Sequence, residues 1–201
     1  MKRNILITGS EGLVGTALRQ AILARGDRTS GLDLLGGGAE RGDVRNAEAV
    51  RAAVDGCEGI IHLAAVSRVV WGERDPDRCW ETNVGGLQNV VQAALRSTQR
   101  PWLILASSRE VYGQPDTLPA NEDAPLRPVN QYGRTKVAGE EVVRRAQERG
   151  LRGGILRLSN VYGSTRDHAD RVIPAFARAA AVGDDLRVDG ADSTFDFTHL
   201  E

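Results

Sequence analysis

The chain has 201 residues, of which 41% are hydrophobic and 26% are charged. These values are typical of globular proteins and exclude a disordered chain. The 26 Lys and Arg residues nearly balance the 27 Asp and Glu residues, so the formal net charge is −1. This balance argues against a dedicated nucleic-acid-binding or anionic-membrane-binding protein, because both need a basic surface. A negatively charged ligand must therefore be held by local geometry.

The two cysteines, Cys57 and Cys79, are too few for a disulfide framework and form no CxxC pair or Cys/His cluster. We interpret them as reduced thiols of a cytoplasmic protein rather than as redox-active residues, and we expect no metal site. The apolar run before Gly9 is too short for a signal peptide or a membrane span.

Apolar runs and helical stripes alternate along the chain. The run at 5–7 predicts a strand buried on both faces, and the fourfold spacing of Val14, Leu18 and Ile22 predicts a helix after it. A second strand ends at 32–33. The elements expected beyond it are a helix at 49–54, a strand at 59–63, a helix at 84–95, a strand at 102–106, a helix at 137–146, a strand at 155–158 and a helix at 173–182. This alternation predicts an α/β protein with a doubly wound parallel sheet of the Rossmann type, in three layers.

Residues 115–128 carry four prolines and several acidic residues without periodicity, which predicts a surface loop. The loop comes after the strand at 102–106, and ligands of open α/β sheets bind outside the carboxyl ends of the strands. It either borders an active site or is a tolerated insertion, and the sequence favours neither.

Gly9, Gly12 and Gly15 form a GxxGxxG turn between the first strand and the first helix. Gly9 allows the tight turn, Gly12 allows a pyrophosphate to approach the backbone, and Gly15 allows close packing of the helix on the strand. The helix N-terminus offers unpaired N–H groups and a partial positive charge. In this context the motif predicts dinucleotide binding rather than a plain turn.

Asp33 follows the second strand, with no basic residue beside it. A carboxylate at this position accepts hydrogen bonds from the adenosine ribose and repels a 2′-phosphate. It therefore predicts NAD rather than NADP as the cofactor. The alternative is that Asp33 caps a local turn that contains residues 36–38.

Four segments together carry a family resemblance, and they are the glycine turn, Gly42-Asp43-Val44, His62-Leu63-Ala64-Ala65 and Thr82-Asn83-Val84-Gly85. The combination resembles the extended short-chain dehydrogenase/reductases, and within them the NAD-dependent epimerase/dehydratase family, over essentially the whole chain. The resemblance implies that residues 43–44 flank the adenine, that residues 63–65 line the path to the nicotinamide, and that Asn83 lies near the nicotinamide ribose. We interpret His62 itself as a buried strand residue.

Tyr132 and Lys136 are four residues apart, so they lie on one face of a helix. For the phenol to act as a base near pH 7, its pKa must fall by about three units, which corresponds to ~4 kcal/mol. A neighbouring ammonium and the positive charge of an oxidised nicotinamide both act in this direction. A YxxxK pattern alone is common, and its alternative interpretation is an exposed aromatic residue beside a solvated lysine. The cofactor motifs that precede the pattern disfavour this alternative.

In the family, the Ser or Thr four residues before the Tyr of a VYG motif is catalytic, and this position is Ser108. The resemblance implies that Ser108 binds the reacting sugar oxygen, that Tyr132 takes its proton, and that Lys136 binds the nicotinamide ribose. In the epimerases of the family, the hydride that NAD⁺ accepts then returns to the opposite face of a keto intermediate.

The pair after Ser108 helps to choose the reaction. Sugar-nucleotide 4,6-dehydratases of the family typically have Asp-Glu here as an acid and a base, whereas this chain has Arg109-Glu110. Arginine does not donate a proton at useful pH, so a dehydratase of that type is disfavoured. The role of Glu110 is open at this stage, between a hydrogen bond to the backbone and one to the substrate.

The segment from Ser159 to Gly163 also resembles the family, which implies that Ser159 approaches the nicotinamide and Asn160 a substrate diphosphate. Phe195 stands where the family usually has an arginine that binds the nucleotide, so a bidentate clamp is missing. Either Arg166 or Arg171 compensates, or the substrate is not a nucleotide sugar.

Together, motifs and resemblance predict a catalytic set of Ser108, Tyr132 and Lys136, and substrate contacts from Ser108, Tyr132 and Asn160. The predicted NAD site consists of Gly9, Gly12, Leu13, Val14, Gly15, Asp33, Asp43, Val44, Leu63, Ala64, Ala65, Asn83, Ser107, Tyr132, Lys136 and Ser159.

We expect residues 1–160 to form an NAD-binding Rossmann domain that carries the catalytic residues. Residues 161–201 are expected to start a substrate-binding region, with most of the family's small C-terminal domain absent from this chain. The expected function is that of a cytoplasmic NAD-dependent nucleotide-sugar epimerase of the UDP-sugar 4-epimerase type. A homodimer through the helices at 84–95 and 137–146 is expected from the relatives. The alternatives are a sugar or sugar-acid dehydrogenase or decarboxylase of the same family, and a non-enzymatic NAD-sensing protein.

Overall fold

The computed structural model describes residues 2–190 and 194–201, so part of the expected range 161–201 lies outside the described residues. The chain divides into two compact units, Met1–Arg157 and Leu158–Glu201. The assignment of NAD binding and substrate binding to two such regions stays a prediction.

The first unit alternates strands and helices, as the sequence predicts. Its elements are β1 (Asn4–Thr8), α1 (Leu13–Ala24), β2 (Arg28–Leu32), η1 (Gly38–Glu40), α2 (Ala47–Val54), β3 (Gly59–His62), α3 (Val69–Arg74), α4 (Pro76–Trp80), the π-helical turn η2 (Glu81–Gly85), α5 (Gly86–Arg96), β4 (Trp102–Ser108), η3 (Arg109–Val111), α6 (Gln131–Glu148) and β5 (Gly153–Leu158).

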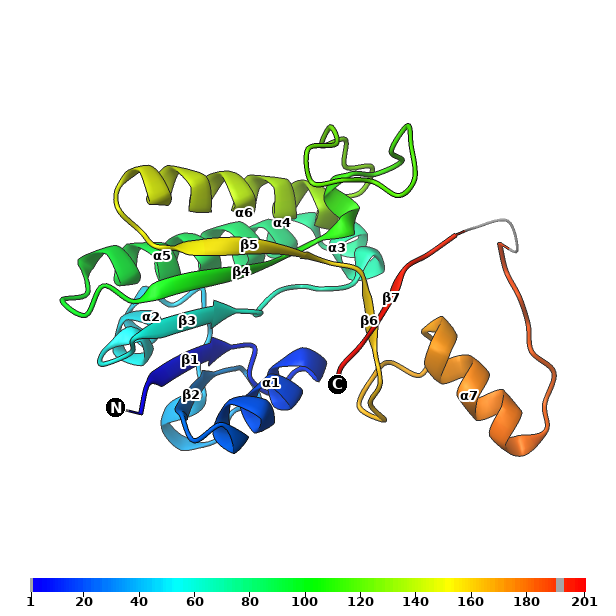
Figure 1. Ribbon diagram of the computed structural model, residues 1–201, viewed down its shortest axis with the longest axis horizontal. Coiled ribbons are helices and arrows are strands. Elements are labelled where there is room, and N and C mark those ends of the chain that lie inside the picture. The colour runs from blue at the N-terminus through cyan, green and yellow to red at the C-terminus, as the bar shows by residue number, and fades with distance from the viewer. Residues whose placement is uncertain (1, 191–193) are drawn as a thin grey trace. The chain divides into compact units, whose positions relative to one another are not determined.

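The strands form one sheet in the order β2-β1-β3-β4-β5, in which β1 pairs in parallel with both β2 and β3, and β3 pairs in parallel with β4 (Figure 1). The chain leaves β1 towards β2 on one side and returns to β3 on the other. In such a sheet the ligand crevice lies outside the carboxyl ends of the two strands at this reversal. The glycine turn follows β1, and residues 63–65 follow β3, so the topology brings these segments to the same edge.

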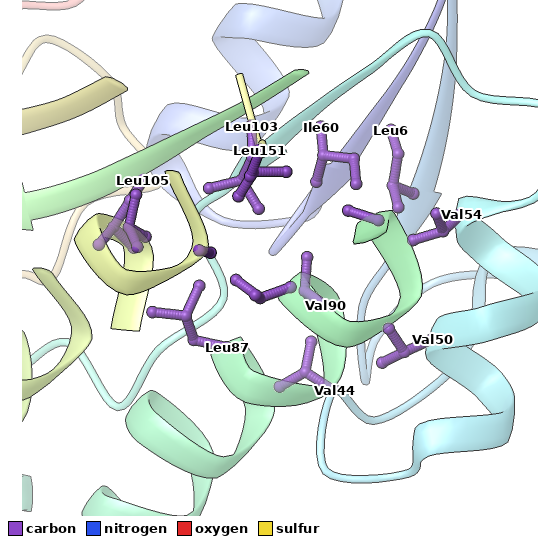
Figure 2. Packing of buried hydrophobic residues seen from close by; sticks show 14 of the residues in the cluster. Leu6, Val44, Val50, Val54, Ile60, Leu87, Val90, Leu103, Leu105 and Leu151 are labelled. Carbon is purple, nitrogen blue, oxygen red and sulfur yellow. The ribbon is translucent and has the colours of Figure 1, made fainter. Parts of the chain in front are cut away.

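The two faces of the sheet are covered by different helices because side chains alternate along each strand. Leu6, Ile60 and Leu103 lie on the face that packs against α2, α5 and α6, and all three are fully buried (Figure 2). Ile5 and Ile7 lie on the other face, where Leu18 and Ile22 of α1 cover them. Helices on both faces confirm the predicted doubly wound, three-layer architecture.

Two boundaries differ from the prediction and bear on the site. Strand β4 continues to Ser108, whereas the apolar run predicts an end at Ala106. Helix α6 begins at Gln131, earlier than the expected residue 137. Both extensions consist of polar residues, which an apolar pattern does not detect. The N-cap Asn130 fixes the start of α6, because its side chain accepts a hydrogen bond from the backbone N–H of Gly133.

The apolar stripes of α5 and α6 lie in the core of the first unit. Leu87 and Val90 of α5 lie in the same cluster as Leu6 (Figure 2). Val91 of α5 and Val143 of α6 belong to it as well, and all four are at most 3% exposed. These stripes are therefore explained by packing within the chain, and the homodimer through α5 and α6 stays a prediction.

The second unit contains β6 (Asn160–Tyr162), α7 (Val172–Val182) and β7 (Phe197–His199). Strands β6 and β7 pair in parallel, and Tyr162 packs edge-on against Phe197 and His199, with ring centroids 6.3 and 5.1 Å apart. Helix α7 ends at Val182 and is capped by Gly183, which has a positive φ of 76°. Among the described residues, no helix has both the length and the apolar character needed to span a bilayer.

Candidate functional site

The glycine turn after β1 has no room for a side chain at Gly9 or Gly15. A Cβ on Gly15 would lie 2.2 Å from the carbonyl oxygen of Gly9, and a Cβ on Gly9 would lie 2.8 Å from the backbone nitrogen of Ala64. Gly9 also has a positive φ of 74°, which disfavours other residues. The turn is thus packed backbone to backbone against α1 on one side and residues 63–65 on the other. Two predicted parts of the cofactor site are therefore in contact.

Helix α1 begins directly after this turn without a capping side chain. Its N-cap is Gly12, no side chain accepts from the first backbone N–H groups, and no acidic residue lies in the first turn. The hydroxyl of the buried Ser10 has no hydrogen-bond partner within the described ranges 2–190 and 194–201. Uncapped N–H groups at a helix N-terminus, with their partial positive charge, suit a pyrophosphate. The residues present, including Leu13 and Val14 of the first turn, fit a dinucleotide.

Asp33 lies between the glycine turn and the turn that follows β2. Its Oδ2 accepts a hydrogen bond from the backbone N–H of Glu11 at 3.0 Å, and its Oδ1 accepts one from Leu35 at 2.9 Å. The carboxylate therefore caps the local turn, as one interpretation expects, and also reaches the glycine turn, while its contact with a ribose stays a prediction. A carboxylate has about four acceptor positions, so two remain to bind a ribose.

Asp43 and Val44 follow the next turn, and their side chains differ in environment. The carboxylate of Asp43 binds the guanidinium of Arg45, with Nη2 2.7 Å from Oδ2, and this hydrogen bond lowers the pKa of Asp43. Val44 is 5% exposed and packs in the core, where a Cβ on Gly86 would lie 2.6 Å from its Cγ2. The structure does not bring the Val44 side chain to an open surface, and its predicted contact with adenine stays a prediction.

His62 is a buried strand residue, as the sequence indicates. Its Nδ1 lies 2.8 Å from the hydroxyl of Thr8 on the adjacent strand β1. Burial lowers the pKa of His62 to about 3, so the imidazole is neutral at physiological pH. Thr8 also accepts a hydrogen bond from the backbone N–H of Ala64 at 3.3 Å, which ties the end of β3 to the end of β1.

Tyr132 and Lys136 lie on the first two turns of α6, and Lys136 points to the end of strand β4. Its Nζ donates a hydrogen bond of 2.8 Å to the carbonyl oxygen of Ala106 and lies 5.5 Å from the ring centroid of Tyr132. Burial lowers the pKa of Lys136 to about 8, while Cys79 and Glu140 act in the opposite direction. The ammonium is therefore protonated near pH 7 and lies close to the phenol.

Ser107 and Ser108 end strand β4, and their hydroxyl groups have different partners. Ser107 donates to Oε1 of the buried Glu140 at 2.6 Å, whereas the hydroxyl of Ser108 accepts from the backbone N–H of Glu110 at 3.2 Å. Ser108 therefore keeps its own proton available as a donor to a ligand. The carbonyl of Ala106, two residues earlier, holds Lys136, so β4 brings two of the three predicted catalytic residues together.

Asn83 lies in the π-helical turn η2, a rare geometry that often marks functional sites. Its Oδ1 accepts from the backbone N–H of Val66 at 2.7 Å, and its Nδ2 donates to Thr135 at 2.9 Å. Thr135 in turn donates to the carbonyl oxygen of Tyr132 at 2.7 Å. The amide of Asn83 thus connects the segment after β3 with the helix that carries Tyr132 and Lys136, and its expected approach to the ribose stays a prediction.

A buried ion pair that the sequence did not predict lies behind these residues. Glu140 is fully buried and binds Arg157 through both carboxylate oxygens, with Nε at 2.9 Å and Nη2 at 2.8 Å. The Nη1 of Arg157 donates to the hydroxyl of Tyr112 and to the carbonyl of Glu122, both at 2.7 Å. One signal was available, because Glu140 is one helical turn from Lys136 and therefore lies on the same buried face.

The predicted residues of the second unit have partners within that unit. Ser159 lies 2.9 Å from the hydroxyl of Thr198, and Asn160 begins β6. Arg171, one of the two arginines proposed to replace the missing clamp, binds Asp167 at 3.1 Å. Phe195 is 49% exposed and faces Phe197, with ring centroids 6.5 Å apart. The expected contacts of these residues with the nicotinamide and a diphosphate stay predictions.

In the part of the chain that the structure describes, no group of three or more His, Cys, Asp or Glu residues is arranged to hold a metal ion. Both cysteines are buried and free, and burial raises the pKa of both thiols.

The sheet order, the glycine turn and the Tyr–Lys pair on α6, which β4 holds through Ala106, define a dinucleotide-binding α/β protein of the short-chain dehydrogenase/reductase type. The chain belongs to the NAD-dependent epimerase/dehydratase family, whose family model matches residues 5–201. This result confirms the resemblance found in the sequence, with NAD as the cofactor of the family.

Curated relatives include a UDP-glucose 4-epimerase of Streptomyces lividans, which is 31% identical over 180 residues and is matched by 83% of this chain. A UDP-glucose 4-epimerase of Mycolicibacterium smegmatis is 32% identical over 209 residues, or 94% of this chain and 67% of the relative. The chain spans 54% of the Streptomyces protein and 61% of a Lactobacillus helveticus UDP-glucose 4-epimerase.

Solved structures of both reaction types resemble the chain. A Brucella ovis UDP-glucose 4-epimerase in complex with NAD has a TM-score of 0.87 and 28% identity, and covers 98% of this chain and 69% of its own. A double mutant of the dTDP-glucose 4,6-dehydratase DesIV from Streptomyces venezuelae, with NAD and DAU bound, has a TM-score of 0.85 and 28% identity, and covers 98% and 68%. The likeness therefore establishes the family and does not separate epimerase from dehydratase.

Proposed function

We propose that this chain carries the cofactor-binding and catalytic part of an NAD-dependent nucleotide-sugar epimerase of the UDP-sugar 4-epimerase type. The observation that carries the proposal is the position of Lys136, whose ammonium is held by the carbonyl of Ala106 and lies 5.5 Å from the Tyr132 ring. It lies at the carboxyl edge of the sheet, where the glycine turn offers a pyrophosphate site.

The chain's own groups suit proton transfer at a sugar hydroxyl. The positive charge of Lys136 lowers the pKa of a nearby phenol, so Tyr132 can accept the hydroxyl proton as a base and give it back as an acid. Ser108 donates a hydrogen bond to the same sugar oxygen and keeps it oriented. Bound NAD would supply the hydride acceptor, and the return of the hydride to the opposite sugar face would invert the carbon.

The choice of an epimerase over a dehydratase rests on two observations. Arg109 stands where the dehydratases of the family typically have an acid, and it forms an ion pair of 2.9 Å with Glu110. The curated relatives named above are UDP-glucose 4-epimerases. The exposed Phe195 leaves the nucleotide part of the substrate less specified than in the family, so the sugar and the nucleotide must be determined by experiment.

The test is to incubate the whole purified chain with NAD⁺ and UDP-glucose and to follow UDP-galactose by proton NMR together with absorbance at 340 nm. Interconversion without a rise in absorbance supports an epimerase. A rise in absorbance that grows with turnover supports the dehydrogenase alternative, and loss of water from the sugar supports a dehydratase.

Two variants make the test specific to the site. Tyr132→Phe should lower the rate by about 10²-fold or more, because general acid–base catalysis contributes this much. Tyr162→Phe removes a hydroxyl from the second unit and serves as the matched control. If Tyr132→Phe keeps full activity, the proposed mechanism is wrong. If neither the wild-type protein nor the Tyr162→Phe control turns over any UDP-, GDP- or dTDP-sugar while NAD still binds, the result supports the NAD-sensing alternative.

A further inference from the structure

Glu110 contacts the segments that carry both Ser108 and Tyr132. It lies in the short turn η3 that follows β4, and its backbone N–H donates to the hydroxyl of Ser108 at 3.2 Å. Its carboxylate Oε2 accepts a hydrogen bond of 2.7 Å from Nδ2 of Asn130, the residue that caps helix α6. One residue therefore joins the end of β4 to the start of the helix that carries the catalytic tyrosine.

Asn130 uses both ends of its amide. While its Nδ2 donates to Glu110, its Oδ1 accepts from the backbone N–H of Gly133 at 2.7 Å. The two partners fix the amide orientation, because a carboxylate only accepts and a backbone N–H only donates. Tyr132 lies between Asn130 and Gly133 in the sequence, so this cap sets the position of the Tyr132 backbone.

Turn η3 and the first turn of α6 are also packed backbone to backbone. A Cβ on Gly133 would lie 2.6 Å from the carbonyl oxygen of Glu110 and 3.0 Å from Cβ of Pro128. At such contact the two segments move together, and the hydrogen bond between Glu110 and Asn130 fixes how they are aligned. The other carboxylate oxygen of Glu110 binds Arg109 at 2.9 Å. The carboxylate, whose side chain is 18% exposed, thus has a protein partner at each oxygen.

We propose that Glu110 is a positioning residue, which fixes the separation of Ser108 and Tyr132 through its hydrogen bond to the capping Asn130, and is not an acid or a base towards the substrate. The inference rests on the proposed function for its activity test, because the positioned groups are those of the proposed reaction. Proton transfer requires alignment to within a fraction of an ångström, and misplacement by about 1 Å costs up to about 10²-fold in rate.

The first experiment compares Glu110→Gln, Glu110→Ala and Asn130→Ser in the whole chain. Glutamine keeps an oxygen that accepts from Asn130, and Arg109, whose side chain is 36% exposed, can turn to water. Serine keeps the helix cap but loses the donor to Glu110. We expect Glu110→Gln to stay within about threefold of wild-type kcat, while Glu110→Ala and Asn130→Ser each lose about 10- to 100-fold in kcat. KM should change by less than about threefold, since the contacts with the ground-state substrate are kept.

The double variant Glu110→Ala with Asn130→Ser tests the link directly. If the two residues act only through their shared hydrogen bond, the double variant is no slower than the slower single variant. Losses that multiply would show independent roles and would overturn the inference. A Glu110→Gln variant that is as slow as Glu110→Ala would overturn it as well, because a proton-transfer role does not survive replacement by an amide.

A second readout does not depend on turnover. The ionisation of Tyr132 is followed by ultraviolet difference absorption of each protein minus its Tyr132→Phe counterpart, with circular dichroism as the check of folding. We expect the phenol of Tyr132 to titrate at a different pH in Glu110→Ala, where its position relative to Ser108 is no longer fixed, and at unchanged pH in Glu110→Gln. If wild type turns over no sugar, the proposed function fails while this titration still decides the role of Glu110. An unchanged titration in folded Glu110→Ala would overturn the inference.

Discussion

Arg157 and Glu140 form a bidentate ion pair behind the predicted catalytic residues, with Nε 2.9 Å from Oε1 and Nη2 2.8 Å from Oε2. Because Glu140 also accepts from Ser107 on β4, while Arg157 donates to Tyr112 and the loop carbonyl of Glu122, the pair connects β4, β5, α6 and the loop after η3. A buried pair of this kind holds several elements in one arrangement, and the loss of one partner leaves the other charge uncompensated.

Glu140→Gln is therefore expected to lower the free energy of unfolding by about 3–5 kcal/mol, measured by urea denaturation. The matched control is Arg145→Ala, which removes the exposed pair with Glu141 on the same helix and should cost about 0.3–0.5 kcal/mol. Hydrogen bonds from Arg157 and Ser107 hold the pKa of Glu140 below its usual value, against the effect of burial. Its stabilising contribution is present above the unfolded pKa and is lost as the pH falls. Equal costs for both variants would contradict this role.

Lys136 should titrate at unusually low pH for a lysine, because burial lowers its pKa from 10.5 to about 8. The chain has two lysines, Lys136 and the exposed Lys2, so ¹³Cε-labelled lysine gives two resonances, and the Lys2 signal is the internal reference. A midpoint for Lys136 at the value of an exposed lysine, about 10.4, would contradict the prediction.

The same shift has a consequence for stability. The unfolded chain binds the Lys136 proton more tightly than the folded chain does, so the free energy of unfolding rises as the pH increases from about 8 to 10.5. Lys136→Met should remove this rise. The difference between the two proteins, measured by denaturation at several pH values, isolates the contribution of Lys136 from that of other titrating groups.

Gly15→Ala should disrupt the glycine turn. The added Cβ would lie 2.2 Å from the carbonyl oxygen of Gly9 and 2.9 Å from Ser10, so the backbone must shift. We expect NAD affinity to fall by at least about tenfold and stability to fall by about 1–3 kcal/mol. Gly85→Ala is the control, because this glycine has helical φ and ψ of −60° and −46° and open space around its Cβ position. It should keep NAD binding and gain about 0.4–1 kcal/mol. Calorimetric titration with NAD measures the affinity of both variants. An unchanged affinity in Gly15→Ala would argue against NAD binding at this turn.

Asp33→Ala should weaken NAD binding and reduce the preference over NADP. A hydrogen bond to a charged group is worth about 1.5–3 kcal/mol, so the affinity for NAD should fall about 10- to 100-fold. The affinity for NADP should fall less, since the negative charge that repels a 2′-phosphate is removed as well. Asp55→Ala, at an exposed carboxylate that follows α2, makes the same change in net charge and is the control. If the ratio of the affinities for NAD and NADP changes equally in both variants, Asp33 does not bind the ribose.

Local patterns were sufficient for the architecture and for part of the site. Val14, Leu18 and Ile22 are spaced as one helix face, the run Ile5-Leu6-Ile7 has the character of a doubly buried strand, and both elements occur where expected. The spacing of Gly9, Gly12 and Gly15 predicts the turn for the same reason, because Gly9 and Gly15 are required by contacts with residues close in the chain or just after the adjacent strand. The four-residue separation of Tyr132 and Lys136 fixes them on one helix face before any packing is known.

What the sequence by itself determined is therefore the alternation of elements, the glycine turn and the Tyr–Lys helix face, all of which follow from short-range periodicity and steric limits. Only the tertiary structure decided which polar side chains meet. Glu140 and Arg157 are 17 residues apart, Glu110 and Asn130 are 20 apart, and Asn83 and Thr135 are 52 apart. Such pairs leave no periodic signal, because a hydrogen bond between distant residues depends on how strands and helices pack and not on their spacing along the chain.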